Sequence, residues 1–143
     1  MSSIRRTADV PYSSEQMYAL VDDIESYPEF LRWCRDARVT RRDGQIVEAT
    51  LDVGLAGFHK QLSTRNSLEP PRRIGIALVA GPFRHLSGEW LFEPRAQGCR
   101  VSLALELESQ VSPFGMIFAA AFEEIARSQL QAFLSRADKL YGT

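Results

Sequence analysis

The chain has 143 residues, of which 45% are hydrophobic and 24% charged, and its formal net charge is −1. This length and composition predict one folded domain over residues 1–143 and exclude a disordered or fibrous chain. No apolar run approaches the roughly 18 residues of a membrane span, and the opening segment MSSIRRTADV lacks the apolar stretch of a secretory signal. A net charge near zero gives no overall field that would attract DNA.

The cysteine pattern points to a reducing environment. Cys34 and Cys99 are far apart and show no Cys-x-x-Cys spacing. Neither a disulfide framework nor a zinc site is therefore indicated. We expect a cytoplasmic protein with both thiols reduced.

The N-terminal part predicts a strand followed by two short helices. Residues 3–10 fit a first strand, and Ser13 followed by Gln16 has the residue types of a capping box. An apolar stripe with helical spacing continues from there, formed by Met17, Leu20, Val21 and Ile24. Pro28 fits the first turn of a second short helix, where its missing N–H does no harm.

Residues 36–109 alternate between polar and apolar side chains, which predicts consecutive antiparallel strands joined by hairpins. The first two strands of this region are expected at 36–42 and from 47, and a longer strand at 58–69. The clearest strand directs Cys99, Val101, Leu103, Leu105 and Leu107 inward. The expected turns or breaks are Asp43-Gly44, Gly54 to Gly57, Pro70-Pro71 and Gly81-Pro82.

One long helix closes the chain, with Ser112 as its cap, Pro113 in its first position and an end near Leu140. About 28 residues at 1.5 Å each give a rod of roughly 42 Å, long enough to cross a curved sheet. The layout predicts an α+β fold with the helices on one face of the sheet. The aromatic stripe of this last helix is typical of a solid core, whereas the small residues Ala119 to Ala121 would leave room for a ligand chamber. The sequence pattern is compatible with both interpretations.

Four sequence blocks, in register along the chain, resemble the coenzyme Q-binding, START-like polyketide cyclase/dehydrase family. They resemble in particular its bacterial branch, which includes ribosome association toxins. The blocks are VPYSSEQMYALVDDIESYPEFLRWC at 10–34, Thr64-Arg65-Asn66, GPFRHLSGEWLF at 81–92, and Gln131-Ala132-Phe133 within the last helix. Arg32 stands where the family pattern has proline. The resemblance implies the helix-grip fold, a curved antiparallel sheet of about seven strands around a long C-terminal helix, with a hydrophobic tunnel.

The resemblance implies a non-enzymatic protein that binds a quinone or related isoprenoid lipid and supports respiratory quinone function. Transient contact with a membrane surface, at the periphery of the inner membrane, would go with that role. Asn66 has two interpretations, a bond to backbone or a contact with a quinone carbonyl. The expected ligand contacts are Tyr27, Phe30, Leu31, Trp33, Asn66, Phe83, Leu86, Trp90, Phe92, Phe114, Phe118 and Phe122.

The alternative function implied by the resemblance is binding to the large ribosomal subunit, which would block subunit association. Its expected contacts are basic, and they are Arg35, Arg38, Arg41 and Arg42. A solvated surface balanced by Asp36 and Asp43 explains the same arginines without a partner, and anionic lipid is a further possible partner.

Enzymatic cyclase chemistry is the third alternative, and it rests on fold analogy alone. His59 and His85 have no neighbour at metal-ligand spacing, and no nucleophile motif is present in the sequence. We therefore expect no catalytic residue, no metal and no catalytic cofactor.

Overall fold

The computed structural model describes residues 2–55 and 57–142. Within them the chain forms seven strands, two α-helices and one 3-10 helix. Their bounds in chain order are β1 (Ser2–Val10), α1 (Ser14–Asp22), η1 (Ile24–Glu29), β2 (Cys34–Asp43), β3 (Ile46–Leu55), β4 (Phe58–Glu69), β5 (Arg73–Ala80), β6 (Phe83–Arg95), β7 (Gly98–Ser109) and α2 (Pro113–Tyr141).

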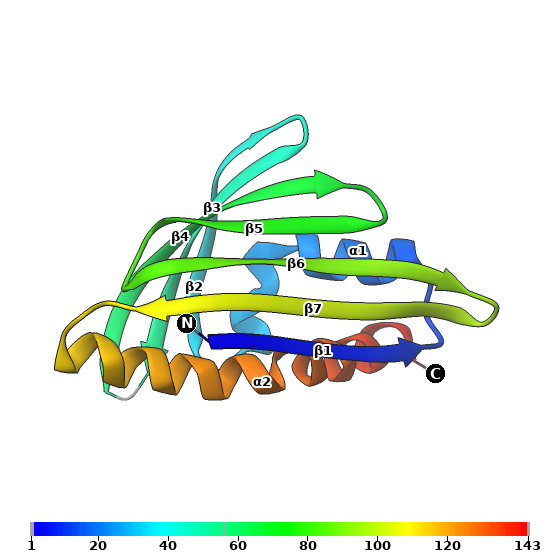
Figure 1. The fold of residues 1–143 in the computed structure, drawn as a ribbon. Coiled ribbons are helices and arrows are strands. Elements are labelled where there is room, and N and C mark those ends of the chain that lie inside the picture. Colours follow the sequence, from blue (N-terminus) through cyan, green and yellow to red (C-terminus); the bar gives the residue numbers. More distant parts are fainter. Residues whose placement is uncertain (1, 56, 143) are drawn as a thin grey trace.

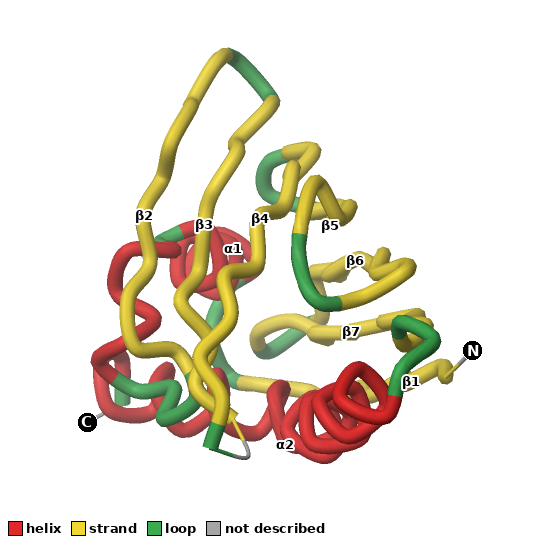
Figure 2. Tube along the Cα trace, turned by 90° about the vertical axis from the view of Figure 1, so that its left-hand side faces the viewer, coloured by secondary structure: helices red, strands yellow, loops and turns green. Residues whose placement is uncertain are grey.

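The strands make one antiparallel sheet in the order β1-β7-β6-β5-β4-β3-β2. The sheet is strongly curved, and α2 runs along its base beside β1 and β7 (Figure 1). Viewed from the side, β2, β3 and β4 stand steeply against β5, β6 and β7, and α1 lies inside the curve (Figure 2). The predicted α+β helix-grip fold is confirmed.

Both α-helices begin where their cap residues predict. The Ser13 hydroxyl accepts a hydrogen bond from the Gln16 backbone N–H at 3.1 Å, and the Gln16 side chain accepts one from the Ser13 N–H at 2.9 Å. These reciprocal bonds satisfy two N–H groups that the first turn of α1 leaves unpaired. The Ser112 hydroxyl accepts from the Gly115 N–H at 2.9 Å, and Pro113 follows it as the first residue of α2.

Three local expectations were wrong. Pro28 is the fifth residue of η1 and lies outside its first turn. The first hairpin turn consists of Gly44 and Gln45, because Asp43 still pairs with Ile46 and Gly44 takes the left-handed φ of 60° that favours glycine. Gly54 belongs to β3, which extends to Leu55, whereas Gly57 is a turn residue with a left-handed φ of 81°.

Phe133 is the centre of the contact between α2 and the rest of the fold. Its ring is fully buried and packs edge-on against three others: Tyr27 at 5.3 Å between centroids, Phe30 at 5.1 Å and Trp90 at 4.9 Å. Edge-to-face contacts at these distances are favourable beyond the apolar area they bury. One residue therefore joins η1, β6 and α2.

We expect Phe133→Ala to lower the free energy of unfolding by about 3–5 kcal/mol, because the cavity it leaves adds to the lost apolar burial. Leu140→Ala, on the same helix at a half-exposed position, should change it by less than about 0.5 kcal/mol. Urea denaturation followed by circular dichroism measures both. Equal effects of the two substitutions would contradict this account of the core.

Candidate functional site

A narrow internal cavity lies between the concave face of the sheet and α2. Its volume is about 100 Å³. Five aromatic side chains line it, and most of the remaining wall is aliphatic. The lining residues are Val21, Ile24, Tyr27, Trp33, Ala49, Leu51, Leu62, Thr64, Asn66, Ile74, Ile76, Leu86, Trp90, Leu103, Leu105, Phe122, Ile125, Ala126, Gln129 and Phe133.

Asn66 is the most distinctive polar group on the cavity wall. It lies on β4, on the same inward face as Leu62 and Leu68, and its residue surface is only 8% exposed. Its side-chain oxygen Oδ1 is buried and has no hydrogen-bond partner in the described residues. A buried acceptor without a partner costs free energy, so this oxygen is suited to accept a hydrogen bond from a bound molecule. The predicted bond from Asn66 to backbone is not formed through this atom.

A hydrogen bond separates the cavity from a groove on the surface. The Trp33 indole Nε1–H donates to Oε1 of Gln129 on α2 at 3.3 Å. The groove outside is lined by Phe30, Leu31, Arg32, Trp33, Gly54, Leu55, Ile125, Ser128 and Gln129. The cavity and the groove share Trp33, Ile125 and Gln129. The Trp33–Gln129 contact therefore lies where the cavity and the groove adjoin.

Six of the twelve predicted ligand contacts lie on the cavity wall. They are Tyr27, Trp33, Asn66, Leu86, Trp90 and Phe122. Phe30 and Leu31 line the outer groove instead. The six residues on the wall come from η1, the loop before β2, strands β4 and β6 and helix α2, so the fold brings them to one hollow from distant parts of the chain.

The other four predicted contacts are not among the residues that line the cavity, and their assignment to its wall is corrected. Phe83 and Phe118 pack on each other at 5.8 Å between ring centroids. Phe92 contacts Tyr18 of α1 at 5.7 Å. Phe114 contacts Phe58 at 4.2 Å, at the start of α2. These rings hold elements together and do not face the open space.

Several wall residues were missed by the sequence analysis. Ile74 and Ile76 of β5 and Leu103 and Leu105 of β7 contribute side chains to the cavity. Their alternation showed that they face inward, but it did not show which part of the inner face is covered by another side chain. Of the small residues on α2, Ala126 lines the space, whereas the Ala119 to Ala121 run does not.

Burial keeps two titratable side chains near the cavity, Tyr27 and Cys34, in their neutral forms near neutral pH. Burial raises the pKa of Tyr27 well above its usual range, and its hydroxyl donates to the Val21 carbonyl. Burial also raises the pKa of Cys34 to about 11, so its thiol is protonated near neutral pH. The His85 ring nitrogen Nε2 bonds to the Ser87 hydroxyl at 2.9 Å. The described residues hold no group of three or more metal-ligating side chains.

The predicted basic cluster is paired with acids of β2 itself and with acids from β3 and α1. Arg41 lies 3.1 Å from Asp43 and 3.6 Å from Glu48, and Arg42 lies 3.2 Å from Asp22 of α1. Arg38 pairs with Asp36 at 3.3 Å, and Arg65 of β4 also reaches Glu48. Arg35 is apart from this group and lies against Gly54. The cluster is therefore an exposed set of ion pairs, and the balanced interpretation describes it better than a bare basic patch.

The fold and cavity define a START-like helix-grip protein. Residues 10–134 match the family described as "Polyketide cyclase / dehydrase and lipid transport", and the chain belongs to this family. The crystal structure of the Zhui aromatase/cyclase from Streptomyces sp. R1128 superposes with a TM-score of 0.84, covering 96% of this chain and 94% of that one at 17% identity.

Similar sequences indicate the branch of the family more closely. Ribosome association toxin RatA of Escherichia coli strain K12 is 42% identical over 99% of this chain and 90% of its own length. Coenzyme Q-binding protein COQ10 homolog B, mitochondrial, of Xenopus laevis is 26% identical over 92% of this chain and 56% of its own length. No helix among the described residues is long and apolar enough to cross a bilayer.

We expect Asn66→Leu to raise the free energy of unfolding by about 1 kcal/mol, because it replaces an unpaired buried acceptor with an apolar group of similar shape. Thr50→Val on the neighbouring strand provides the contrast. It removes a hydroxyl that is paired with Ser63 at 2.8 Å, and it should lower stability by about 1 kcal/mol. Thermal or urea unfolding measures both; a marked loss of stability in Asn66→Leu would contradict the unpaired state of its oxygen.

Proposed function

We propose that this protein binds the large ribosomal subunit and interferes with the association of the two subunits. One observation carries the proposal: the 42% identity to ribosome association toxin RatA extends over 99% of this chain and 90% of the relative. A match of this extent includes surface residues as well as the core. The Zhui aromatase/cyclase shares the fold at 17% identity, and that likeness carries no activity to this chain.

The hairpin formed by β2 and β3 is the surface that we assign to ribosome contact. It projects beyond the neighbouring strands, so it can reach a large partner before the rest of the molecule does (Figure 2). Arg38, Arg41 and Arg42 are exposed on it. Exposed ion pairs contribute only about 0–1 kcal/mol each, so an RNA phosphate can replace the acid beside each guanidinium. The paired acids also limit indiscriminate binding to other RNA.

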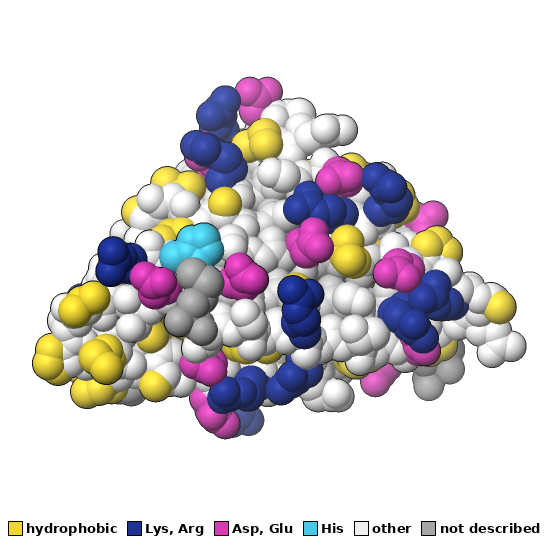
Figure 3. Space-filling model, in the orientation of Figure 1, with side chains coloured by type: hydrophobic (Ala, Val, Ile, Leu, Met, Phe, Trp, Pro, Cys, Tyr) yellow, Lys and Arg dark blue, Asp and Glu magenta, His cyan; other side chains and the backbone are white. Residues whose placement is uncertain are grey.

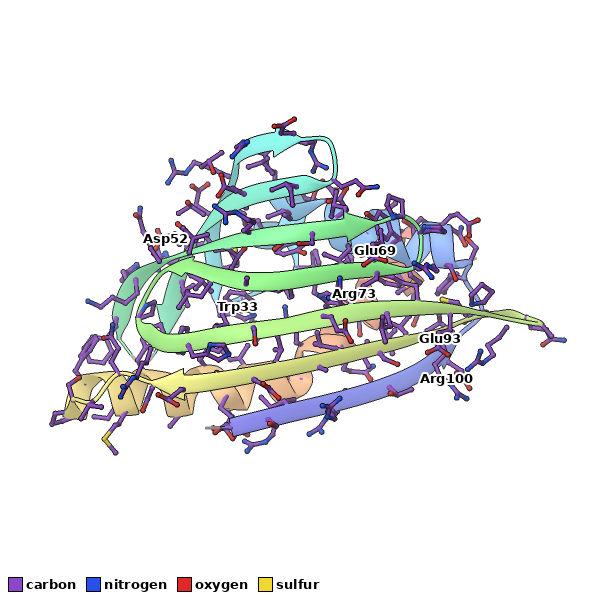
Figure 4. The ribbon with its side chains drawn as sticks, turned by 45° about the horizontal axis from the view of Figure 1, so that its top comes forward. Trp33, Asp52, Glu69, Arg73, Glu93 and Arg100 are labelled. Carbon is purple, nitrogen blue, oxygen red and sulfur yellow. The ribbon has the colours of Figure 1, made fainter. Side chains whose placement is uncertain are left out.

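Charge reversal tests this surface. We expect Arg41→Glu combined with Arg42→Glu to weaken cosedimentation with purified large subunits at least tenfold, and to lower the dependence of binding on salt by about one unit of log–log slope per lost phosphate contact. The matched control is Arg95→Glu with Arg100→Glu, on the β6–β7 hairpin, where both arginines are also ion-paired; Figure 4 labels Arg100.

The control should change ribosome binding less than twofold. Circular dichroism verifies that both variants fold. The proposed function fails if the wild-type chain does not sediment with large subunits. The assignment to the β2–β3 hairpin fails if the two double variants lose binding equally.

As a second candidate we propose that the cavity binds the head group of a hydrophobic ligand of the quinone class. The apolar wall with a single unpaired acceptor favours it, and the printed name of the Xenopus laevis relative gives the ligand class. A volume of about 100 Å³ is smaller than the roughly 150 Å³ cavity that holds one benzene ring. A quinone ring would thus enter only if wall side chains move, and parting of Trp33 from Gln129 provides the route.

The reduced ligand should bind more tightly than the oxidised one, because only a quinol hydroxyl can donate to the buried, unpaired Asn66 oxygen. A quinone carbonyl can accept from the Asn66 amide N–H but leaves that oxygen without a partner. We expect a short-chain ubiquinol to raise the melting temperature more than the matching ubiquinone does. Asn66→Leu should remove this difference. Equal shifts for both redox forms in the wild type, or no shift with either, would contradict the second candidate.

A further inference from the structure

Apolar side chains gather on the surface where α2 begins. Val111 is 85% exposed, Met116 59% and Ile117 56%. Beside them lie two half-buried rings, Phe58 from the start of β4 and Phe114, whose centroids are 4.2 Å apart. We call these five residues the apolar tip. Hydrophobic side chains are visibly concentrated over the N-terminal end of α2 (Figure 3).

The burial of apolar surface elsewhere in the fold makes this tip unusual. Large hydrophobic side chains exposed by half or more are otherwise represented among the described residues by Val79 and by Leu140 near the other end of α2. Single exposed apolar residues are ordinary on protein surfaces, whereas a contiguous group marks a contact with another apolar phase. We therefore expect the apolar tip to contact another molecule or a membrane.

Cations without ion-pair partners in the described part of the chain lie on the β3–β4 hairpin and on the segment around the start of β2, and Lys60 is the one that contacts the tip. Lys60 Nζ is 4.7 Å from the centroid of the Phe114 ring. Arg35 packs on Gly54 of the same β3–β4 hairpin, on the face of the sheet opposite Lys60, and Arg32 lines the groove with Leu55. We call these three residues the basic rim. Eleven arginines elsewhere in the chain form ion pairs, but no member of the basic rim does within the described residues.

We propose that the apolar tip and the basic rim form a surface that docks on membranes containing anionic lipid. Apolar side chains would enter the boundary between headgroups and acyl chains, while Lys60, which lies over the Phe114 ring, meets the anionic headgroups beside them. The cations of the basic rim, together with the apolar tip, are the reason for proposing an anionic membrane rather than a second copy of the chain or an RNA. A second copy of the chain would bring two basic rims together, and RNA would match the rim but leave the tip without an apolar counterpart. This inference is independent of the proposed ribosome function.

Vesicle cosedimentation tests the docking surface with the full chain. We expect binding to vesicles that mix phosphatidylglycerol with phosphatidylcholine, at least tenfold tighter than to phosphatidylcholine alone. Met116→Asp combined with Ile117→Asp should weaken that binding at least tenfold. Both positions are exposed, and acidic residues are favourable near a helix N-terminus, so the fold should persist.

The charge contribution is tested separately. Lys60→Glu should weaken binding to the anionic vesicles at least fivefold, and the loss should shrink as salt is raised. The matched controls lie at the other end of α2. Leu140→Asp places a carboxylate on a half-exposed apolar residue, and Lys139→Glu reverses an exposed lysine that has no ion pair among the described residues. Each control should change vesicle binding less than twofold.

Four results would overturn the proposal. They are no binding of the wild-type chain to anionic vesicles, equal losses in the tip variants and the controls, a dimer in sedimentation velocity that Met116→Asp with Ile117→Asp dissolves, and loss of ribosome cosedimentation in that same variant. The third result would assign the tip to a second copy of the chain, and the fourth to the ribosome. Retained ribosome binding with lost vesicle binding supports the proposal and leaves the ribosome function intact.

Discussion

The geometry of a straight helix against a curved sheet governs the interior of this protein. Strands β2 to β4 turn away from β5 to β7, so α2 cannot touch the whole concave face at once. The helix is fixed to the sheet and to η1 by Phe122 and Phe133, which contact Trp33, Tyr27 and Trp90. Between these contacts the small side chain of Ala126 leaves a gap that the surrounding residues do not close. Close packing is the rule in protein interiors, so such a gap is a specific property of this architecture.

Three separate regions follow from this arrangement. The cavity lies inside, the β2–β3 hairpin projects on one side, and the apolar tip lies at the start of α2. The outer face of the sheet is occupied mainly by ion pairs between neighbouring strands, such as Arg73 with Glu69 (Figure 4). Because the three regions use different residues, a ribosome contact and a bound ligand are compatible in one molecule.

The sequence predicted those features that depend on neighbouring residues. Ser13 and Gln16 identified the start of α1, and Ser112 with Pro113 identified the start of α2, because capping is a local interaction. The shift of the first turn to Gly44 and Gln45 could not be derived from the pair Asp43-Gly44, since the strand pairing extends one residue further. The resemblance to a family added the wrapping of a curved sheet of about seven strands around that long helix.

The candidate site was harder to predict, because it depends on which inward side chains remain uncovered. Phe92 and Phe114 have the same apolar character as Trp90 and Phe122, yet Tyr18 and Phe58 cover the first pair. The arginine cluster shows the same limit. Asp22 lies twenty positions before Arg42, and only the fold brings the two together. Sequence spacing reveals the charges of a segment but not the partners that arrive from other elements.

An unfilled apolar space inside the fold is the central claim, and xenon NMR tests it most directly, since dry apolar cavities take up xenon. The account predicts a saturable xenon signal in the wild-type protein, with chemical-shift changes at methyl groups of Ile74 and Leu103. Ala126→Leu, which places a larger side chain in the gap, should abolish that signal while the protein stays folded. A non-saturating response that is the same in both proteins would show that the interior is filled, and it would contradict the account.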